Sequence, residues 1–421
     1  MKVSKYNVIT KMNKDNYILC NILYKSIISY KKDEHEKILL GLKGISKFPE
    51  INKILFDNNF VINDEVNEEE IIINFMKKRI LNENTLNLTI FSTLDCNFKC
   101  VYCYQNHIKE SNLSSENINY IIKFIERKIN SKNNINLSWF GGEPLMNFKN
   151  IEKLNSYLIK KYPKKRFISS IITNGYLLSE KISDKLIRDL KVRNFQITLD
   201  GNKSSHNKRR FLKNNKNIDT FNQILNNLIY ILKKYKDNVF VNLRINIYSQ
   251  MSENDLDFLF YLSEFKNNIF VSLNPIHNNP GENPGLNENS SKIIKKIINL
   301  YKYVKKLGFS TKEWFYENKY NSCTSGMKNS YFILPNREQI ICTGVDFEKN
   351  NIIGQINKNG IIETYSGRNN FNKNIDIDDE CLNCKVLPIC LQGCDYIRNI
   401  KNKKVCIPQK YYLDEYVKLL F

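Results

Sequence analysis

The chain has 421 residues, of which 42% are hydrophobic and 25% are charged. This composition is typical of a globular protein and excludes a disordered one. No apolar run approaches the length of a membrane span, and residues 1–14 contain no apolar signal-peptide core. We therefore expect a cytoplasmic protein of two or three domains with no membrane partner.

The formal net charge of +21 has two interpretations. A strongly basic protein can bind nucleic acid or an acidic peptide. Alternatively, the charge reflects a composition in which Lys, Asn and Ile are plentiful and Lys is spread over many segments. The sequence contains no recognisable nucleic-acid-binding module, so we predict no nucleic-acid partner. An acidic peptide remains the alternative to biased composition.

Residues 1–84 predict a small α+β domain. Short strand-like runs are followed by helical patterns, at 7–10, 17–23 and 26–30 and then at about 33–43, 48–56 and 66–82. Elements in this order could form a winged-helix-like module. The alternative is a structural N-terminal extension.

From residue 85 to about 310 the pattern alternates. The strand-like runs are 86–92, 135–140, 167–173, 194–199, 239–247 and 269–274, and the helix-like runs are 113–130, 147–161, 179–190, 218–236, 252–265 and 288–307. Six βα units in succession predict an α/β fold with a parallel sheet and right-handed crossovers. Six units are too few for a closed eight-stranded barrel. Active sites on such folds lie at the carboxyl ends of the strands.

Three cysteines follow the first of these strands, with Cys96, Cys100 and Cys103 in a CxxxCxxC spacing. Three thiolates on one loop can hold three irons of a 4Fe–4S cluster and leave the fourth iron open. A zinc site would usually have a fourth ligand, which His107 could provide. Clustered cysteines in a chain without an export signal indicate metal binding, not disulfides.

Further motifs follow the next three strands: Gly141-Gly142-Glu143, Asn174-Gly175 and Asp200-Gly201. Together with the cysteine loop, they resemble the radical SAM superfamily, and within it the enzymes that carry a C-terminal SPASM domain. The resemblance covers about residues 85–410. It implies a curved, open six-unit (β/α)6 partial barrel over residues 85–310. It also implies that Cys96, Cys100 and Cys103 hold a 4Fe–4S cluster whose open iron binds S-adenosylmethionine (SAM), the source of a 5′-deoxyadenosyl radical.

The same resemblance implies which residues contact SAM. These are Tyr102 beside the adenine, Gly141, Gly142 and Glu143 at the methionyl amine, and Thr198 and Arg210 at the carboxylate and ribose. An Arg suits a carboxylate because its donors form a bidentate fork. Arg209 is adjacent, so the register could be off by one, and two solvated arginines are the alternative. His206 matches a family position, where we expect a structural role.

The C-terminal region, residues 311–421, contains seven cysteines in an order that resembles the SPASM pattern. Four cysteines could also form a zinc ribbon. The resemblance implies two auxiliary 4Fe–4S clusters, the first bound by Cys323, Cys342 and Cys394 and the second by Cys381, Cys384, Cys390 and Cys406. With the cluster on the first loop, the total would be three.

Two departures from the resembled pattern bear on function. No further Cys lies between Cys323 and Cys342, so the first auxiliary cluster would have an open iron that could hold a substrate thiolate. Sulfatase-maturating enzymes have an Asp general base at the position of Thr343, and Asp346 is close but displaced. A smaller departure is Arg337, where Gly is usual, so we expect the local turn to differ.

The sequence therefore predicts a peptide maturase that forms a thioether between a Cys sulfur and a carbon of a ribosomally made precursor. The alternatives are sulfatase-maturating-type modification or carbon–carbon crosslinking. The expected partners are a precursor peptide with a leader segment and an electron donor of the flavodoxin or ferredoxin type. Residues 1–84 resemble in position the domain that binds a leader by adding it as a strand to a sheet edge. A zinc-stabilised basic nucleic-acid-binding protein is the reading from a different class.

Overall fold

The structure is a computed structural model of the chain. It describes all residues except 46, 104, 106–110, 131, 277–287, 312–322, 346, 348, 366–376, 400 and 421. His107, Asp346 and the predicted loop at 276–287, apart from Ile276, thus lie outside the described residues. The chain divides into two compact units. The first comprises Met1–Ile80, Lys312–Cys323 and Lys373–Phe421, and the second comprises Leu81–Thr311 and Thr324–Asn372. The region predicted as one C-terminal domain, 311–421, is thus divided between the units.

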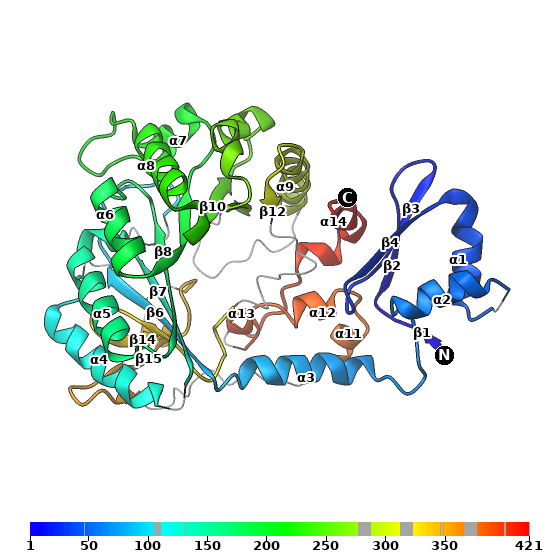
Figure 1. The fold of residues 1–421 in the computed structure, drawn as a ribbon, viewed down its shortest axis with the longest axis horizontal. Coiled ribbons are helices and arrows are strands. Elements are labelled where there is room, and N and C mark those ends of the chain that lie inside the picture. The colour runs from blue at the N-terminus through cyan, green and yellow to red at the C-terminus, as the bar shows by residue number, and fades with distance from the viewer. Residues whose placement is uncertain are drawn as a thin grey trace. The chain divides into compact units, whose positions relative to one another are not determined.

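The second unit is built on an 11-stranded sheet of order β12-β11-β10-β9-β8-β7-β6-β13-β14-β15-β16 (Figure 1). Its central strands are β6 (Thr85–Thr93), β7 (Asn134–Gly141), β8 (Arg166–Thr173), β9 (Val192–Thr198), β10 (Phe240–Ile247) and β11 (Ile269–Pro275). Each pairs in parallel with the next. The predicted parallel sheet is therefore confirmed, with all six strands in the expected positions.

Short strands extend this sheet at both edges. They are β12 (Ser310–Thr311), β13 (Ser330–Ile333), β14 (Glu338–Ile340), β15 (Ile352–Ile356) and β16 (Ile362–Thr364). β12 pairs in parallel with β11, and β13 pairs in parallel with β6. β14, β15 and β16 continue from β13 as an antiparallel meander. Part of the cysteine-rich region thus continues the sheet, which the sequence analysis did not predict.

Helices connect the parallel strands, and α4, α5, α6 and α8 lie along one side of them (Figure 1). The helical segments of this unit are α4 (Ser115–Ile129), η2 (Pro144–Asn147), α5 (Phe148–Lys161), α6 (Glu180–Asp184), η3 (Lys185–Asp189), α7 (Lys203–Arg209), α8 (Thr220–Tyr235), η4 (Lys236–Asn238), η5 (Glu253–Phe265), α9 (Glu288–Lys306) and η6 (Lys349–Asn351). Apolar side chains at helical spacing, such as Phe221, Ile224, Leu228 and Ile231 of α8, are buried. The short helix α7 was not predicted.

The turn between β13 and β14 keeps the conformation that a glycine would adopt there. Arg337 has φ 72°, in the left-handed region that non-glycine residues rarely occupy. Its guanidinium donates to the carbonyl of Ile356 at 2.6 Å and lies over the ring of Tyr120, 4.9 Å from the centroid. Side-chain contacts thus offset the strain of a residue with a Cβ atom in this conformation. The expected difference of the turn from the resembled pattern stays a prediction.

The first unit contains a three-stranded antiparallel sheet of order β2-β3-β4. Its elements are β1 (Lys2–Val3), β2 (Asn7–Lys11), β3 (Asn16–Asn21), β4 (Ser26–Lys31), η1 (Lys32–Glu34), α1 (His35–Leu42), α2 (Pro49–Asp57), β5 (Val61–Ile62), α3 (Glu68–Ile80), α11 (Asp379–Leu382), α12 (Leu387–Cys390), α13 (Asp395–Asn399), η7 (Pro408–Lys410) and α14 (Leu413–Lys418). Leu19, Tyr30, Leu55 and Phe60 form part of its apolar core. The strands and helices predicted for residues 1–84 are present.

One edge of this small sheet is covered and the other is not paired. Helix α14 contacts β2, and the hydroxyl of Thr10 donates to Asp414 at 2.9 Å. Among the strands that the structure describes, β4 pairs only with β3. The outer side of β4 is therefore not paired with another described strand, although the N–H of Lys31 there donates to Glu34 at 3.1 Å.

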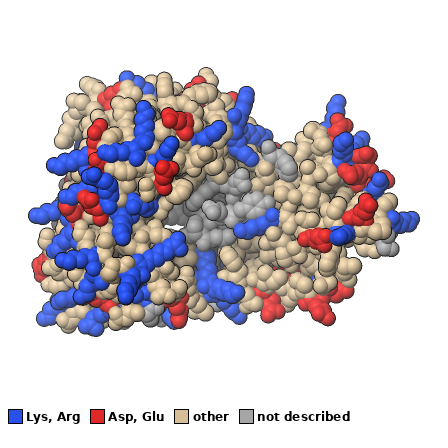
Figure 2. Space-filling model, viewed as in Figure 1, with Lys and Arg blue, Asp and Glu red and all other residues tan. Residues whose placement is uncertain are grey.

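Within the described residues, no helix is both long and apolar enough to span a membrane. On the face seen in Figure 2, Lys and Arg side chains are spread widely, with Asp and Glu side chains between them.

Candidate active site

The predicted motifs follow the carboxyl ends of four neighbouring parallel strands. The cysteine loop follows β6, Gly141 ends β7, Asn174 follows β8, and Asp200 lies two residues after the end of β9. Adjacent parallel strands bring these ends to one edge of the sheet, where active sites of such folds lie.

Main-chain hydrogen bonds hold the cysteine loop against the segment after α7. The N–H of Lys99 donates to the carbonyl of Phe211 at 2.9 Å, and the N–H of Val101 donates to Arg209 at 3.0 Å. The N–H of Lys213 returns a bond to Asn97 at 2.9 Å. This antiparallel contact fixes the register between the cysteines and residue 210.

A buried polar network lies behind the loop. The hydroxyl of Tyr102 donates to the Asp200 carboxylate and accepts from Arg210 at 2.8 Å and from Asn246 at 3.0 Å. Asn246 also donates its main-chain N–H to Asp200 at 2.8 Å. Arg210 is 7% exposed, so its charge depends on these neighbours. The structure thus brings together Tyr102 and Arg210, which the sequence analysis had named separately.

Arg210, not Arg209, is the arginine of this network. Burial alone would lower the pKa of the Arg210 guanidinium, but Cys100, Tyr102 and Asp200 outweigh it and raise that pKa well above its usual value. The Arg209 guanidinium instead lies over the ring of Tyr248, 3.3 Å from the centroid. The structure therefore places Arg210 in the network and Arg209 outside it, and the assignment of Arg210 to SAM stays a prediction.

His206 has a structural contact. Its Nδ1 accepts the main-chain N–H of Asp200 at 3.1 Å. Burial, with the charge of Arg210, lowers the pKa of the His206 ring well below its usual value, so the ring is neutral. A neutral, buried imidazole that holds the Asp200 main chain agrees with the structural role expected for it.

Glu143 ties the ends of β7 and β8 together. Its carboxylate is fully buried and accepts from the hydroxyl of Thr173 at 2.7 Å, from the N–H of Asn174 at 2.7 Å and from the N–H of Leu145 at 3.0 Å. Burial nevertheless raises the pKa of this carboxyl from 4.5 to about 7. All these donors come from its own unit, so Glu143 positions the strand ends.

The two glycines of the motif allow close contact with the root of the cysteine loop. A Cβ atom on Gly141 would lie 2.0 Å from the carbonyl oxygen of Thr93, and one on Gly142 would lie 2.2 Å from that of Asp95. The N–H groups of Gly142 and Glu143 donate to these same carbonyls at 3.0 and 2.9 Å. Main-chain packing is therefore a structural reason for glycine at these two positions.

The sequence analysis did not name Asn246, and it named Asn174 only as part of a motif, without a role. Asn246 donates to both Asp200 and Tyr102. In the sequence it lies near the end of a largely apolar strand, and its polarity there is the one feature that could have indicated a role. Asn174 lies in a motif, and its side chain donates to Asn97 at 2.8 Å and contacts the sulfur of Cys96 at 3.9 Å. Thr198 is where expected, at the end of β9 beside Arg244 of β10.

The donor set of the cysteine loop fits an iron–sulfur cluster. All cysteines are free thiols, and burial raises the pKa of Cys96 to about 12 and of Cys100 to about 11, with Arg210 opposing the rise for Cys100. Iron would therefore displace protons from these thiols on binding. The buried Nε of Arg210 has no hydrogen-bond partner among the described residues. An added acceptor such as a carboxylate would complete it.

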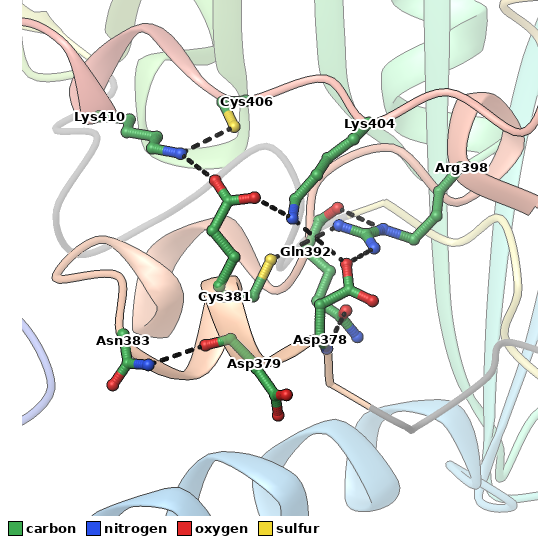
Figure 3. A network of polar contacts seen from close by, with 10 residues as sticks. Asp378, Asp379, Cys381, Asn383, Gln392, Arg398, Lys404, Cys406 and Lys410 are labelled. Atoms are coloured by element: carbon green, nitrogen blue, oxygen red, sulfur yellow. Dashed lines mark hydrogen bonds and ion pairs between the residues drawn. The ribbon is translucent and has the colours of Figure 1, made fainter.

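The four cysteines assigned to the second auxiliary cluster line one recess in the first unit. Cys381, Cys384, Cys390 and Cys406 share it with Val386, Leu387, Ile407 and several charged residues. The pKa of the Cys390 thiol is raised to about 12, mainly by burial and to a smaller extent by the nearby Cys406, Cys384 and Cys381, against a main-chain hydrogen bond from Ile407 that lowers it. Figure 3 shows Cys381 and Cys406 within a network of ion pairs. The fourfold thiol set fits a cluster with four protein ligands.

The cysteines assigned to the first auxiliary cluster are divided between the units. Cys342 follows β14 in the second unit and packs against an apolar cluster that includes Phe91 and Ile340. Cys323 and Cys394 belong to the first unit. Their assignment to one cluster remains a prediction. Among the described residues, no three His, Cys, Asp or Glu side chains are grouped closely enough to hold a single metal ion.

Comparison with known families finds a related domain in the second unit. Residues 90–261 match the family model of the Radical SAM superfamily. Residues 90–261 are therefore similar to a radical SAM domain.

Two curated proteins are similar to parts of the chain. The chain is 30% identical over 288 residues to the radical SAM cyclopropyl synthase TigE of Paramaledivibacter caminithermalis, covering 60% of this chain and 56% of that protein. It thus spans little more than half of that relative. A serine-type anaerobic sulfatase-maturating enzyme of Bacteroides thetaiotaomicron is 37% identical over 95 residues, which cover 20% of this chain and 22% of that one.

Solved structures confirm the fold. The structure of anSMEcpe with bound AdoMet matches with a TM-score of 0.60 at 19% identity, covering 79% of this chain and 92% of that one. SuiB of Streptococcus suis bound to S-adenosylmethionine matches with a TM-score of 0.50 at 17% identity, covering 96% and 97%. At these identities the likeness concerns the fold alone.

The Tyr102 hydroxyl should be worth more than an ordinary surface hydroxyl. Tyr102→Phe leaves Asp200 and Arg210 buried with one partner fewer, so we expect a loss of about 1–3 kcal/mol in the free energy of unfolding, measured with urea. Tyr176→Phe is the matched control, because its ring packs edge-on against Phe98 in the same region. Equal losses in the two variants would contradict the network described above.

The Glu143 carboxyl should make stability fall as pH rises. The unfolded chain loses this proton near pH 4.5 and the folded chain near pH 7, so the folded state binds more protons in between. The free energy of unfolding of the metal-free protein should therefore fall by about 3 kcal/mol across that window, relative to Glu143→Gln. Urea unfolding at pH 5 to 8 measures this. A difference between the two proteins that stays constant with pH would refute it.

Proposed function

We propose that this protein is a peptide maturase of the radical SAM class, acting on a ribosomally made precursor. The observation that carries the proposal is the three-cysteine loop, fixed in register with Arg210 at the carboxyl edge of the sheet. The relatives support a peptide substrate. TigE is by name a cyclopropyl synthase, and anSMEcpe has been solved with AdoMet and a Cp18Cys peptide.

The cofactors that we infer are SAM and three 4Fe–4S clusters. Cys96, Cys100 and Cys103 would hold the SAM-binding cluster. Cys323, Cys342 and Cys394 would hold the first auxiliary cluster, and Cys381, Cys384, Cys390 and Cys406 the second, within a SPASM domain at 311–421. The bound cofactors would supply the one-electron chemistry that produces a 5′-deoxyadenosyl radical.

Residues of this chain would bind and orient SAM at the mouth of a six-unit partial barrel. We assign the SAM carboxylate and ribose to Thr198 and Arg210. Arg210 is suited to this because its guanidinium is charged, is fixed by Tyr102 and has no partner at Nε among the residues that the structure describes. The ring of Tyr102 would flank the adenine while its hydroxyl stays in the network. Gly141, Gly142 and Glu143 would present main-chain groups to the methionyl amine.

The bond that we propose is a thioether between a peptide Cys sulfur and a carbon. It is supported by the three-ligand set assigned to the first auxiliary cluster, whose open iron could hold the substrate thiolate. Carbon–carbon bond formation is the alternative, and the cyclopropyl synthase favours it. An electron donor of the flavodoxin or ferredoxin type would complete the system in the cytoplasm.

The N-terminal module offers a place for a leader peptide. Strand β4 pairs on one side only among the described strands, whereas β2 is covered by α14. A leader could therefore add as a strand beside β4 and gain main-chain hydrogen bonds. This is the edge at which we propose that the precursor docks.

The crosslink can be tested directly by mass spectrometry. Anaerobically reconstituted protein, SAM and reductant should convert a Cys-containing precursor to a product lacking two hydrogen atoms. A thioether product resists thiol alkylation, whereas a carbon–carbon product still accepts the alkylating group. The triple variant Cys96→Ala/Cys100→Ala/Cys103→Ala should form neither product nor 5′-deoxyadenosine. It should also contain about eight irons per chain instead of about twelve. Zinc without iron in the wild type would overturn the proposal.

Leader docking can be tested by hydrogen exchange of the main-chain amides. The unmodified precursor should slow exchange in β4, residues 26–31, because its own strand would pair there. Exchange in β2, residues 7–11, should stay unchanged and serves as the internal control. A precursor shortened to its core should lose the effect. Protection of β2 with none in β4 would place the docking site elsewhere.

A further inference from the structure

Two cations donate directly to sulfurs in the recess of the first unit. Nη2 of Arg398 lies 3.6 Å from Sγ of Cys381, and Nζ of Lys410 lies 3.6 Å from Sγ of Cys406 (Figure 3). Distances of this size are hydrogen-bond distances for the larger sulfur atom. These two cysteines belong to the set assigned above to the second auxiliary cluster.

Both cations are held in place by other partners. The Arg398 guanidinium pairs with the carboxylate of Asp378, and its Nε donates to the carbonyl of Gln392 at 3.1 Å. Nζ of Lys410 also lies 2.9 Å from the Glu380 carboxylate. Because each cation already has a fixed partner, its side chain is ordered before a cluster binds. It can therefore stay beside the sulfur without a further loss of side-chain entropy.

Positive charges outnumber negative charges in the ion-pair network that lines the recess. Arg398, Lys404 and Lys410 provide three positive charges against the two carboxylates of Asp378 and Glu380. The carboxylates are the more exposed partners, at 49% and 61%, whereas the cations are 21–32% exposed. Solvent therefore screens the negative charges more than the positive ones.

Apolar side chains also line the recess. Val386, Leu387 and Ile407 are at most 2% exposed and line it near Cys390. In such surroundings a charge interacts more strongly than it would in water. The lining of the recess therefore combines buried apolar side chains with hydrogen-bonding cations.

We propose that Arg398 and Lys410 raise the reduction potential of the second auxiliary cluster by donating charged hydrogen bonds to the Cys381 and Cys406 thiolates. Reduction adds one electron, and thus one negative charge, to the cluster without breaking a bond. Adjacent cations stabilise the added charge, and hydrogen bonds to cluster sulfurs act in the same direction. The inference rests on the proposed function, because it requires a cluster on these four cysteines.

A structural role for the same residues predicts a different result. If the ion pairs served only to hold the segment 398–410, Lys404 should matter as much as its neighbours. Nζ of Lys404 lies 2.6 Å from Glu380 and 3.5 Å from Asp378, but the structure shows no hydrogen bond from it to a sulfur. Lys404→Gln is therefore a matched control for a lost charge and lost ion pairs.

The test is a redox titration with dithionite, followed by electron paramagnetic resonance of the reconstituted full-length protein. The couple that disappears in Cys390→Ala is assigned to the second auxiliary cluster. Arg398→Gln and Lys410→Gln should each shift the one-electron equilibrium toward the oxidised cluster at least tenfold, a fall of about 59 mV. Lys404→Gln should give less than half that shift. Arg398→Lys, which keeps the positive charge, should have a reduction potential closer to that of the wild type than to that of Arg398→Gln.

Iron content separates the possible failures. Unchanged potentials in both Gln variants with full iron would overturn the inference, as would a shift in Lys404→Gln equal to theirs. If Arg398→Gln does not assemble, Lys410→Gln measures the same effect at the more exposed of the two positions. If Cys390→Ala contains as much iron per chain as the wild type, the second auxiliary cluster does not exist. That result would also contradict the cofactor set of the proposed function.

Discussion

The main-chain contact between the cysteine loop and residues 209–213 is the constraint on which the site depends. It aligns Val101 with Arg209 and Lys99 with Phe211. Arg210, which lies between these two partners, therefore faces inward beside Cys100. The segment can reach this position because α7 turns the chain back after β9. A loop containing three cysteines and few apolar side chains has little core of its own. Main-chain hydrogen bonds to residues 209–213 therefore hold it in one conformation.

Buried charge explains why the surrounding residues form a network instead of separate contacts. Removing a guanidinium from water is costly unless it is paired and hydrogen-bonded. Arg210 obtains this compensation from Tyr102, and through it from Asp200, whose main chain is in turn held by His206. Glu143 is the opposite case, a carboxylate with three donors that burial still drives toward protonation. Together they connect the ends of four strands through polar contacts.

The sequence predicted the parallel sheet because its long strands and helices alternate with clear periodicity, and the motifs could be placed at the strand ends for the same reason. It could not predict β13–β16, whose strands of three to five residues lie among cysteines. Nor could spacing distinguish Arg209 from Arg210, since both side chains are compatible with a helix end. Asn246 and the packing role of Gly141 became evident only in three dimensions, because each depends on a neighbour far away in sequence.

The two cysteine sites differ in charge, and this difference bears on how they would divide their work. The first loop has one buried cation, Arg210, near Cys100 and two buried acids, Asp200 near Cys100 and Glu143 near Cys96. The recess of the first unit has three cations against two more exposed carboxylates. Since an electron is held more firmly where positive charge is in excess, a cluster in the recess would accept electrons more readily than one on the loop. Under the proposed function, the loop would then be the site that must donate an electron to SAM, and the recess the site suited to receive one.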